Sequence, residues 1–131
     1  MKKLKGLMIM LLVSLSLFGF SACQGENTFT YEQITAKEAK EIMDTEQDYT
    51  IVDARTKEEF AEGHIKNAIL IPEYEIASSA ENELPDKEQL ILVYCRSGRR
   101  SKIASEELVK LGYKNVKEFG GIIDWPYEIV K

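Results

Sequence analysis

A cysteine lies where an apolar run ends and a helical pattern begins, in the segment Cys95-Arg96-Ser97-Gly98-Arg99-Arg100. A free cysteine thiol titrates near pH ~8.5, and the start of a helix together with nearby guanidinium groups lowers that value. The backbone N–H groups of such a loop point inward and bind an anion, and Gly98 is free to adopt a positive φ. The sequence therefore predicts a reactive thiolate and an anion-binding site at the same place.

The alternative interpretation is a buried structural cysteine at the end of a strand, followed by a solvated basic turn. Arginines and a glycine so close to Cys95 are poor core material. We therefore favour Cys95 as a nucleophile. The candidate substrate-binding residues are the ones that follow it, Arg96, Ser97, Gly98, Arg99, Arg100 and Ser101.

This loop resembles the active-site loop of the rhodanese-like sulfurtransferases, Cys-Arg-Ser-Gly-x-Arg-Ser, over residues 95–101. Residues 51–55 and Gly63-His64-Ile65 resemble the upstream Asp-x-Arg and Gly-His-Ile signature of that family. Phe119-Gly120-Gly121 and Trp125 also fit, so the resemblance covers about residues 45–130. The departures are small: Asn67 stands where the family usually has glycine, and Leu70 where it often has asparagine or histidine.

The resemblance implies one rhodanese-like α/β domain at residues 35–131, with a parallel central sheet and helices on both faces. It implies a sulfurtransferase in which Cys95 takes a sulfane sulfur from a small anionic donor such as thiosulfate. The sulfur would be held as a persulfide and passed to a thiol or cyanide. The resemblance also gives His64 a structural role. We expect a monomer without cofactor or metal, because one histidine and one free cysteine supply too few metal ligands.

Phosphatases and arsenate reductases are the main competing class, since their Cys-x5-Arg loops also present a thiolate to an oxyanion. Such a loop needs arginine six positions after the cysteine, where this chain has Ser101. The shorter loop favours a single sulfur on Cys95 over a tetrahedral phosphate. A non-catalytic rhodanese-like binding module is the third alternative, and such modules typically lose the cysteine that is present here.

The N-terminus predicts export. Residues 1–5 carry three lysines, and residues 7–20 form an apolar stretch too short to span a bilayer. Residues 20–23, Phe-Ser-Ala-Cys, resemble a bacterial lipoprotein processing site, although leucine is usual at the phenylalanine position. We expect a signal peptide at residues 1–22, lipidation of Cys23, and an acylated tether and lead-in at residues 23–34. The alternative is an ordinary signal peptide in which Cys23 has no role.

Removing residues 1–22 leaves 14 of the 17 basic residues and all 22 acidic ones, so the net charge becomes −8. An acidic domain is repelled by nucleic acid and by anionic lipid headgroups, which excludes both as expected partners. Lipidation would leave Cys95 without a disulfide partner within the chain. The predicted location is extracytoplasmic, with a lipid anchor on the outer face of a bacterial plasma membrane or on the outer membrane.

Apolar runs alternate with helical patterns along the rest of the chain, which indicates a parallel sheet covered by helices. Asp53 and Cys95 both lie at the carboxyl ends of predicted strands, where sites form in such folds. Asp53 either supports the loop through Arg96 or Arg100, or caps its own turn. We expect Arg55 to form a surface ion pair with its acidic neighbours. Strands are predicted at 31–34, 49–53, 68–71, 90–94 and 116–119, and helices at 35–44, 56–62, 73–81, 101–111 and 122–130.

Overall fold

The computed structural model describes residues 30–131 of the chain. The predicted signal peptide, the lipidation site Cys23 and most of the tether lie outside the described residues. No helix within residues 30–131 is long and apolar enough to cross a membrane.

Strands and helices alternate along the described residues. Threonine capping boxes begin the first two helices: Thr35 and Glu38 exchange side-chain and backbone hydrogen bonds, as do Thr56 and Glu59. The elements are β1 (Glu32–Gln33), α1 (Ala36–Thr45), β2 (Tyr49–Asp53), α2 (Lys57–Glu62), β3 (Ile69–Leu70), η1 (Glu73–Glu75), α3 (Ile76–Glu83), β4 (Leu90–Cys95), α4 (Arg99–Lys110), β5 (Asn115–Gly121) and η2 (Ile122–Asp124).

The strands form one parallel sheet in the order β1-β5-β4-β2-β3, with β4 at the centre. Their carboxyl ends therefore meet at one edge, where Asp53 is paired with Tyr94 and Cys95 with Gly121. The β4–β5 register shifts between Val93 and Cys95. This edge is where sites form in open parallel sheets, and it brings the predicted nucleophile to the centre of the fold.

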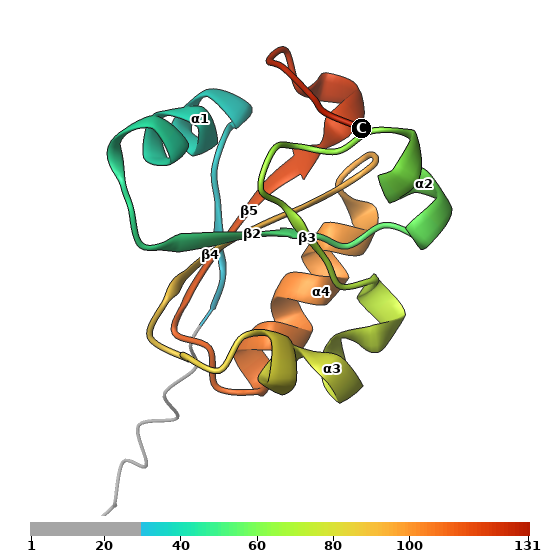
Figure 1. Ribbon diagram of the computed structural model, residues 1–131. Helices are drawn as coiled ribbons and strands as arrows, with labels where there is room; N and C mark the ends of the chain where they lie inside the picture. The colour runs from blue at the N-terminus through green and yellow to red at the C-terminus, as the bar shows by residue number, and fades with distance from the viewer. Residues whose placement is uncertain (1–29) are drawn as a thin grey trace, which may run out of the picture.

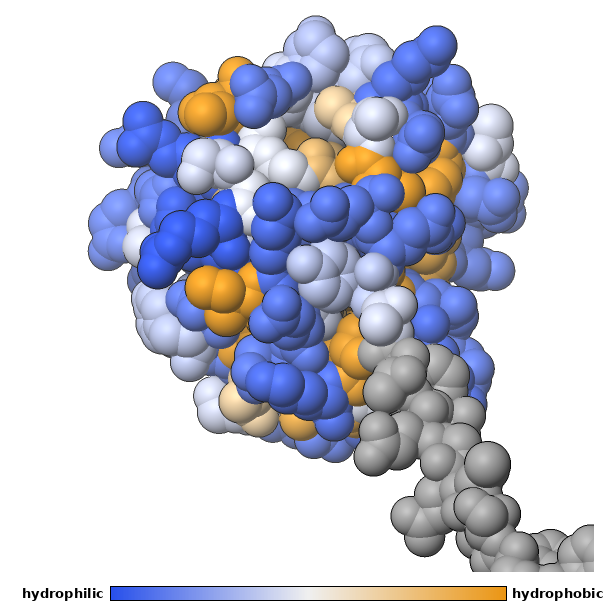
Figure 2. Space-filling view, turned by 180° about the vertical axis from the view of Figure 1, so that it is seen from behind, coloured by the Kyte–Doolittle hydropathy of each residue, from blue (hydrophilic) through white to orange (hydrophobic). Residues whose placement is uncertain are grey.

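Helices cover both faces of the sheet (Figure 1). Helices α3 and α4 pack on one face through Ile76, Ala80, Ala104 and Leu108. On the other face, α1 and the segment after β5 pack through residues that include Ala39 and Trp125. This arrangement confirms the predicted α/β class. On the side seen in Figure 2, apolar residues appear as separate patches in a hydrophilic surface.

The predicted elements differ from the structure mainly at their ends. The helix expected at 122–130 is wrong, because only η2 forms there and Val130 then makes an antiparallel bridge to His64. Pro126 is the physical reason, since a residue before proline is held in extended backbone, as Trp125 is at φ −80° and ψ 109°. Helix α4 begins at Arg99 rather than at 101, and the helix expected at 73–81 divides into η1 and α3.

Candidate functional site

Cys95 lies at the end of the central strand and is fully buried. Its sulfur accepts a hydrogen bond from the backbone N–H of Gly98, with 3.0 Å between N and Sγ. Gly98 has φ 101° and is the residue before α4, so a left-handed glycine turns the chain from the strand into the helix. The turn leaves a backbone donor aimed at the sulfur.

The end of β5 and the short helix η2 that follows it support the backbone of this loop. The N–H of Ile123 donates to the carbonyl of Arg96 over 3.2 Å. Gly121 lies against the same carbonyl, and a Cβ atom placed there would be 2.0 Å from the Arg96 oxygen. Real Cβ atoms do not approach so closely. The loop therefore takes this path only because residue 121 is glycine.

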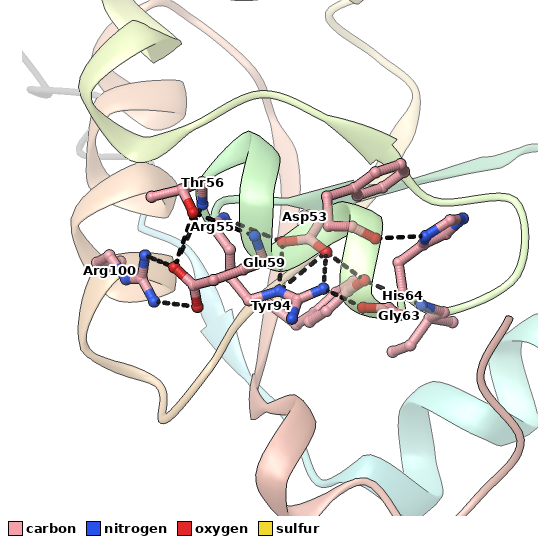
Figure 3. Close-up of polar contacts among 10 residues, drawn as sticks. Asp53, Arg55, Thr56, Glu59, Gly63, His64, Tyr94 and Arg100 are labelled. Atoms are coloured by element: carbon pink, nitrogen blue, oxygen red, sulfur yellow. Dashed lines mark hydrogen bonds and ion pairs between the residues drawn. The ribbon is translucent and has the colours of Figure 1, made fainter. Parts of the chain in front are cut away.

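The loop arginines have different surroundings. Arg96 and Arg99 are exposed. Arg100 donates to both carboxylate oxygens of Glu59 on α2, over 2.7 and 2.9 Å (Figure 3). Its hydrogen bond to Glu59 raises the pKa of Arg100, with smaller contributions from the charges of Cys95 and Asp53. The Arg100 guanidinium is therefore held by α2.

Glu59 contacts both its own helix and the residues that follow Cys95. Its carboxylate caps α2 through Thr56 and also holds Arg100. The hydrogen bond from Arg100 lowers the pKa of Glu59 to about 2. No local sequence pattern predicts this second contact, because Arg100 lies 41 positions after Glu59.

Asp53 does not bond to Arg96 or Arg100. Its carboxylate accepts hydrogen bonds from the backbone and side chain of Arg55, over 2.7–3.1 Å, and from the Tyr94 hydroxyl over 2.6 Å (Figure 3). Arg55 also donates to the carbonyl of Gly63 over 2.6 Å. The predicted surface ion pair of Arg55 is therefore wrong, because this side chain is buried and paired with Asp53.

This buried network joins the ends of β2 and β4 to the segment after α2. Burial opposes the charge of Arg55, but the hydrogen bond and the charge of Asp53 outweigh it and raise the pKa of Arg55. Burial, and then the negative charge of Asp53, raise the pKa of Tyr94, so the phenol stays protonated. Asp53 accepts the Arg55 N–H and so caps its own turn, which is one of the two predicted alternatives. It also contacts Tyr94, the residue directly before Cys95.

Ser101, predicted as a substrate-binding residue, lies in the first turn of α4. It is fully buried, and its hydroxyl donates to the carboxylate of Glu118 over 2.6 Å. This contact commits the hydroxyl to the protein interior. The sequence analysis missed Glu118, although its spacing from Val116 in a strand places both on one buried face.

His64 has the structural surroundings expected of it. Its ring stacks on Phe60 with 3.8 Å between the ring centroids, and Nδ1 lies 2.9 Å from the Phe60 carbonyl oxygen. Among residues 30–131, no group of three or more histidine, cysteine, aspartate or glutamate side chains is placed to hold a metal ion.

The site thus combines a buried thiol, a backbone donor on its sulfur, and arginines around the loop. Such a site can hold negative charge on a cysteine sulfur and can accept an anionic reactant.

The curated proteins to which the chain is similar include two thiosulfate sulfurtransferases. Over 73 residues the chain is 37% identical to the thiosulfate sulfurtransferase PspE of Escherichia coli, covering 56% of this chain and 70% of PspE. Over 96 residues it is 34% identical to the thiosulfate sulfurtransferase GlpE of Coxiella burnetii, covering 72% of this chain and 87% of GlpE.

Solved structures agree with the fold. A rhodanese with anions from E. coli superposes with a TM-score of 0.60 at 35% identity, covering 63% of this chain and 98% of that one. A rhodanese-like domain protein from Staphylococcus aureus gives a TM-score of 0.63 at 34% identity, covering 74% and 93%. The family model described as the rhodanese-like domain matches residues 35–126. The chain belongs to the rhodanese-like domain family.

Proposed function

We propose that this protein is a sulfurtransferase that works by a ping-pong mechanism through a persulfide on Cys95. The Cys95 thiolate attacks the outer sulfur of thiosulfate, a new S–S bond forms, and the bond within thiosulfate breaks. Sulfite leaves with the electron pair of that bond. A thiolate or cyanide then attacks the outer sulfur of the persulfide, which returns the electron pair to Cys95 and regenerates the thiolate.

The observation that carries this proposal is the hydrogen bond from the Gly98 N–H to the sulfur of Cys95. A backbone donor held in this position stabilises negative charge on the attacking thiolate, and again on the Cys95 sulfur when the persulfide is cleaved. Arg96 and Arg99, exposed beside it, give a local positive field that attracts a small anion to an otherwise acidic protein. The thiosulfate sulfurtransferases among its relatives support the same reaction class.

The phosphatase alternative fits the site less well. The sixth residue after Cys95 is Ser101, whose hydroxyl is bound by Glu118. The arginine one position earlier, Arg100, is held by Glu59. Neither side chain is therefore free to bind a tetrahedral oxyanion over the sulfur. The retained cysteine likewise favours an enzyme over a binding module.

The test is mass spectrometry of the purified full-length protein after treatment with thiosulfate. We expect one added sulfur on the wild-type protein and none on Cys95→Ser. Activity is then compared on thiosulfate, a thiol persulfide and an aryl phosphate. An unchanged sulfur-transfer rate in Cys95→Ser would rule out the mechanism, and ready hydrolysis of the aryl phosphate without any sulfur transfer would establish the phosphatase instead.

We further propose an extracytoplasmic location for this activity, with the domain held on a bacterial membrane through diacylated Cys23. The support for it is the sequence of residues 1–23. One acyl chain gives only marginal binding, whereas two anchor a protein stably. Because residue 24 is glutamine rather than aspartate, we expect the outer membrane in an organism that has two membranes.

A further inference from the structure

A buried carboxylate lies beneath the Cys95 loop. Glu118, on β5, is 3% exposed and is the register partner of Val93 on β4. Within residues 30–131 no lysine, arginine or histidine forms an ion pair with it. Burying a carboxylate without a cationic partner costs free energy, so the hydrogen bonds that it accepts must offset that cost.

One oxygen of Glu118 joins two segments that shape the loop. Oε1 accepts the Ser101 hydroxyl of α4 over 2.6 Å and the Gly120 N–H of β5 over 2.8 Å. The Ser101 hydroxyl has a single hydrogen, and Glu118 is the nearest of its acceptors; the Gly98 carbonyl lies at 3.1 Å. The carboxylate therefore fixes the first turn of α4 to the end of β5.

Gly98 lies directly over this junction. A Cβ atom built on Gly98 would be 3.9 Å from Glu118 Oε1 and 3.5 Å from the Gly120 Cα. The N–H of the same glycine is the donor on the Cys95 sulfur. Any shift of α4 away from β5 would therefore move Gly98 and change the aim of this donor.

We propose that Glu118 is the positioning residue of the active-site loop, which it holds through Ser101 and Gly120 so that the Gly98 N–H stays aimed at Cys95. The proposal rests on the proposed function for its catalytic meaning, since the same donor would stabilise the negative charge on Cys95 before the attack on the donor and after the persulfide is cleaved. Glu118 hydrogen-bonds to Ser101 and Gly120 but not to the sulfur, so it affects Cys95 only through these two residues.

Two substitutions separate the hydrogen bonds of Glu118 from its charge. Glu118→Ala removes the acceptor and leaves the Ser101 hydroxyl and the Gly120 N–H without it. Glu118→Gln keeps an oxygen that accepts both bonds and removes the negative charge. The charged groups near Cys95 that remain in every variant are Arg96, Arg99 and Arg100 of the loop and α4, Asp53 and Arg55 at the end of β2, and Glu59 of α2.

The experiment measures the rate of Cys95 alkylation by iodoacetamide between pH 5 and pH 10 in the full-length protein. In Glu118→Ala we expect the midpoint of the profile at higher pH and a rate at neutral pH about 10-fold lower, because hydrogen bonds to charged groups are strong. Ser101→Ala should behave in the same way. Glu118→Gln should keep the wild-type midpoint or move it to lower pH, since the negative charge is gone.

Ser105→Ala is the matched control. Ser105 is equally buried one turn further along α4, and its hydroxyl donates to the Ser101 carbonyl over 2.7 Å. We expect this variant to keep the wild-type alkylation profile even if its melting temperature falls. If Glu118→Ala does not fold, Ser101→Ala and Glu118→Gln still give the comparison.

Three results would overturn the proposal: wild-type profiles in both alanine variants at 101 and 118, a raised midpoint in Glu118→Gln, or an equal shift in Ser105→Ala. Alkylation needs no sulfur donor. A protein that transfers no sulfur but shows the expected shifts would therefore contradict the proposed function and leave the role of Glu118 intact.

Discussion

The Glu59 carboxylate binds the Arg100 guanidinium through two parallel hydrogen bonds of 2.7 and 2.9 Å. This bidentate pair connects α2 with the first turn of α4. The same carboxylate accepts the Thr56 hydroxyl and N–H at the start of α2. A helix cap and the position of a loop cation thus depend on one side chain.

The Glu59–Arg100 pair predicts a pH dependence of stability. The folded-state pKa of Glu59, about 2, lies below its ordinary value of 4.5. The unfolded chain therefore binds the proton more readily, so the pair stabilises the protein above about pH 4.5 and this contribution is lost as the pH falls through about 2. The free energy of unfolding of Glu59→Gln should be below that of the wild type at pH 7, and the difference should shrink from pH 4.5 to pH 2 in urea titrations. A difference that is constant over this range would show that the charge of Glu59 does not matter.

The buried pair of Asp53 and Arg55 predicts a large loss of stability on breaking it. Asp53→Asn leaves the Arg55 guanidinium buried without its counter-charge, which costs about 3–5 kcal/mol. Urea unfolding measures the loss. Glu32→Gln is the control, because it breaks the exposed pair with Lys117 and should cost less than ~1 kcal/mol. Equal losses in the two variants would contradict the structural role of Asp53.

Gly121→Ala should displace the active-site loop. The added Cβ would lie 2.0 Å from the Arg96 carbonyl oxygen, so the loop backbone must move. We expect sulfur transfer to fall by at least ~10-fold, equal to about 1.4 kcal/mol of transition-state stabilisation. Gly112→Ala provides the comparison, since Gly112 has φ 97° and lies after α4 against Lys87. It should cost about 1–2 kcal/mol of stability from backbone strain and keep the activity. Full activity in Gly121→Ala would show that the loop tolerates another path.

Cys23→Ala tests the proposed anchor. If Cys23 carries the acyl chains, this variant should move from the membrane fraction to the soluble extracytoplasmic fraction, and metabolic labelling with a fatty acid should disappear. Cys95→Ala is the control, because it removes the other cysteine and should stay on the membrane. A Cys23→Ala protein that remains as firmly bound as the wild type would contradict lipidation.

Residues that are close in sequence and regular in pattern could be predicted. The central strand with its loop and the capping boxes at Thr35 and Thr56 follow from local pattern, and the structure has them. The partners of the site could not be predicted in this way. Glu59 and Arg100 lie 41 positions apart, and Ser101 and Glu118 lie 17 apart, so only the folded sheet brings them together. For Arg55, the acidic residues nearby in sequence suggested a surface ion pair. In the structure its side chain is buried and pairs with Asp53 instead.

The shortness of the two outer strands has a consequence for behaviour at high concentration. The sheet ends in β1 and β3, which have two residues each. Unpaired backbone groups on an outer strand are a template for β-pairing between molecules, and very short strands offer little of it. The outer strand β1 also carries the charged Glu32 beside Lys117. The two outer strands therefore offer little backbone for pairing between molecules when the protein is concentrated.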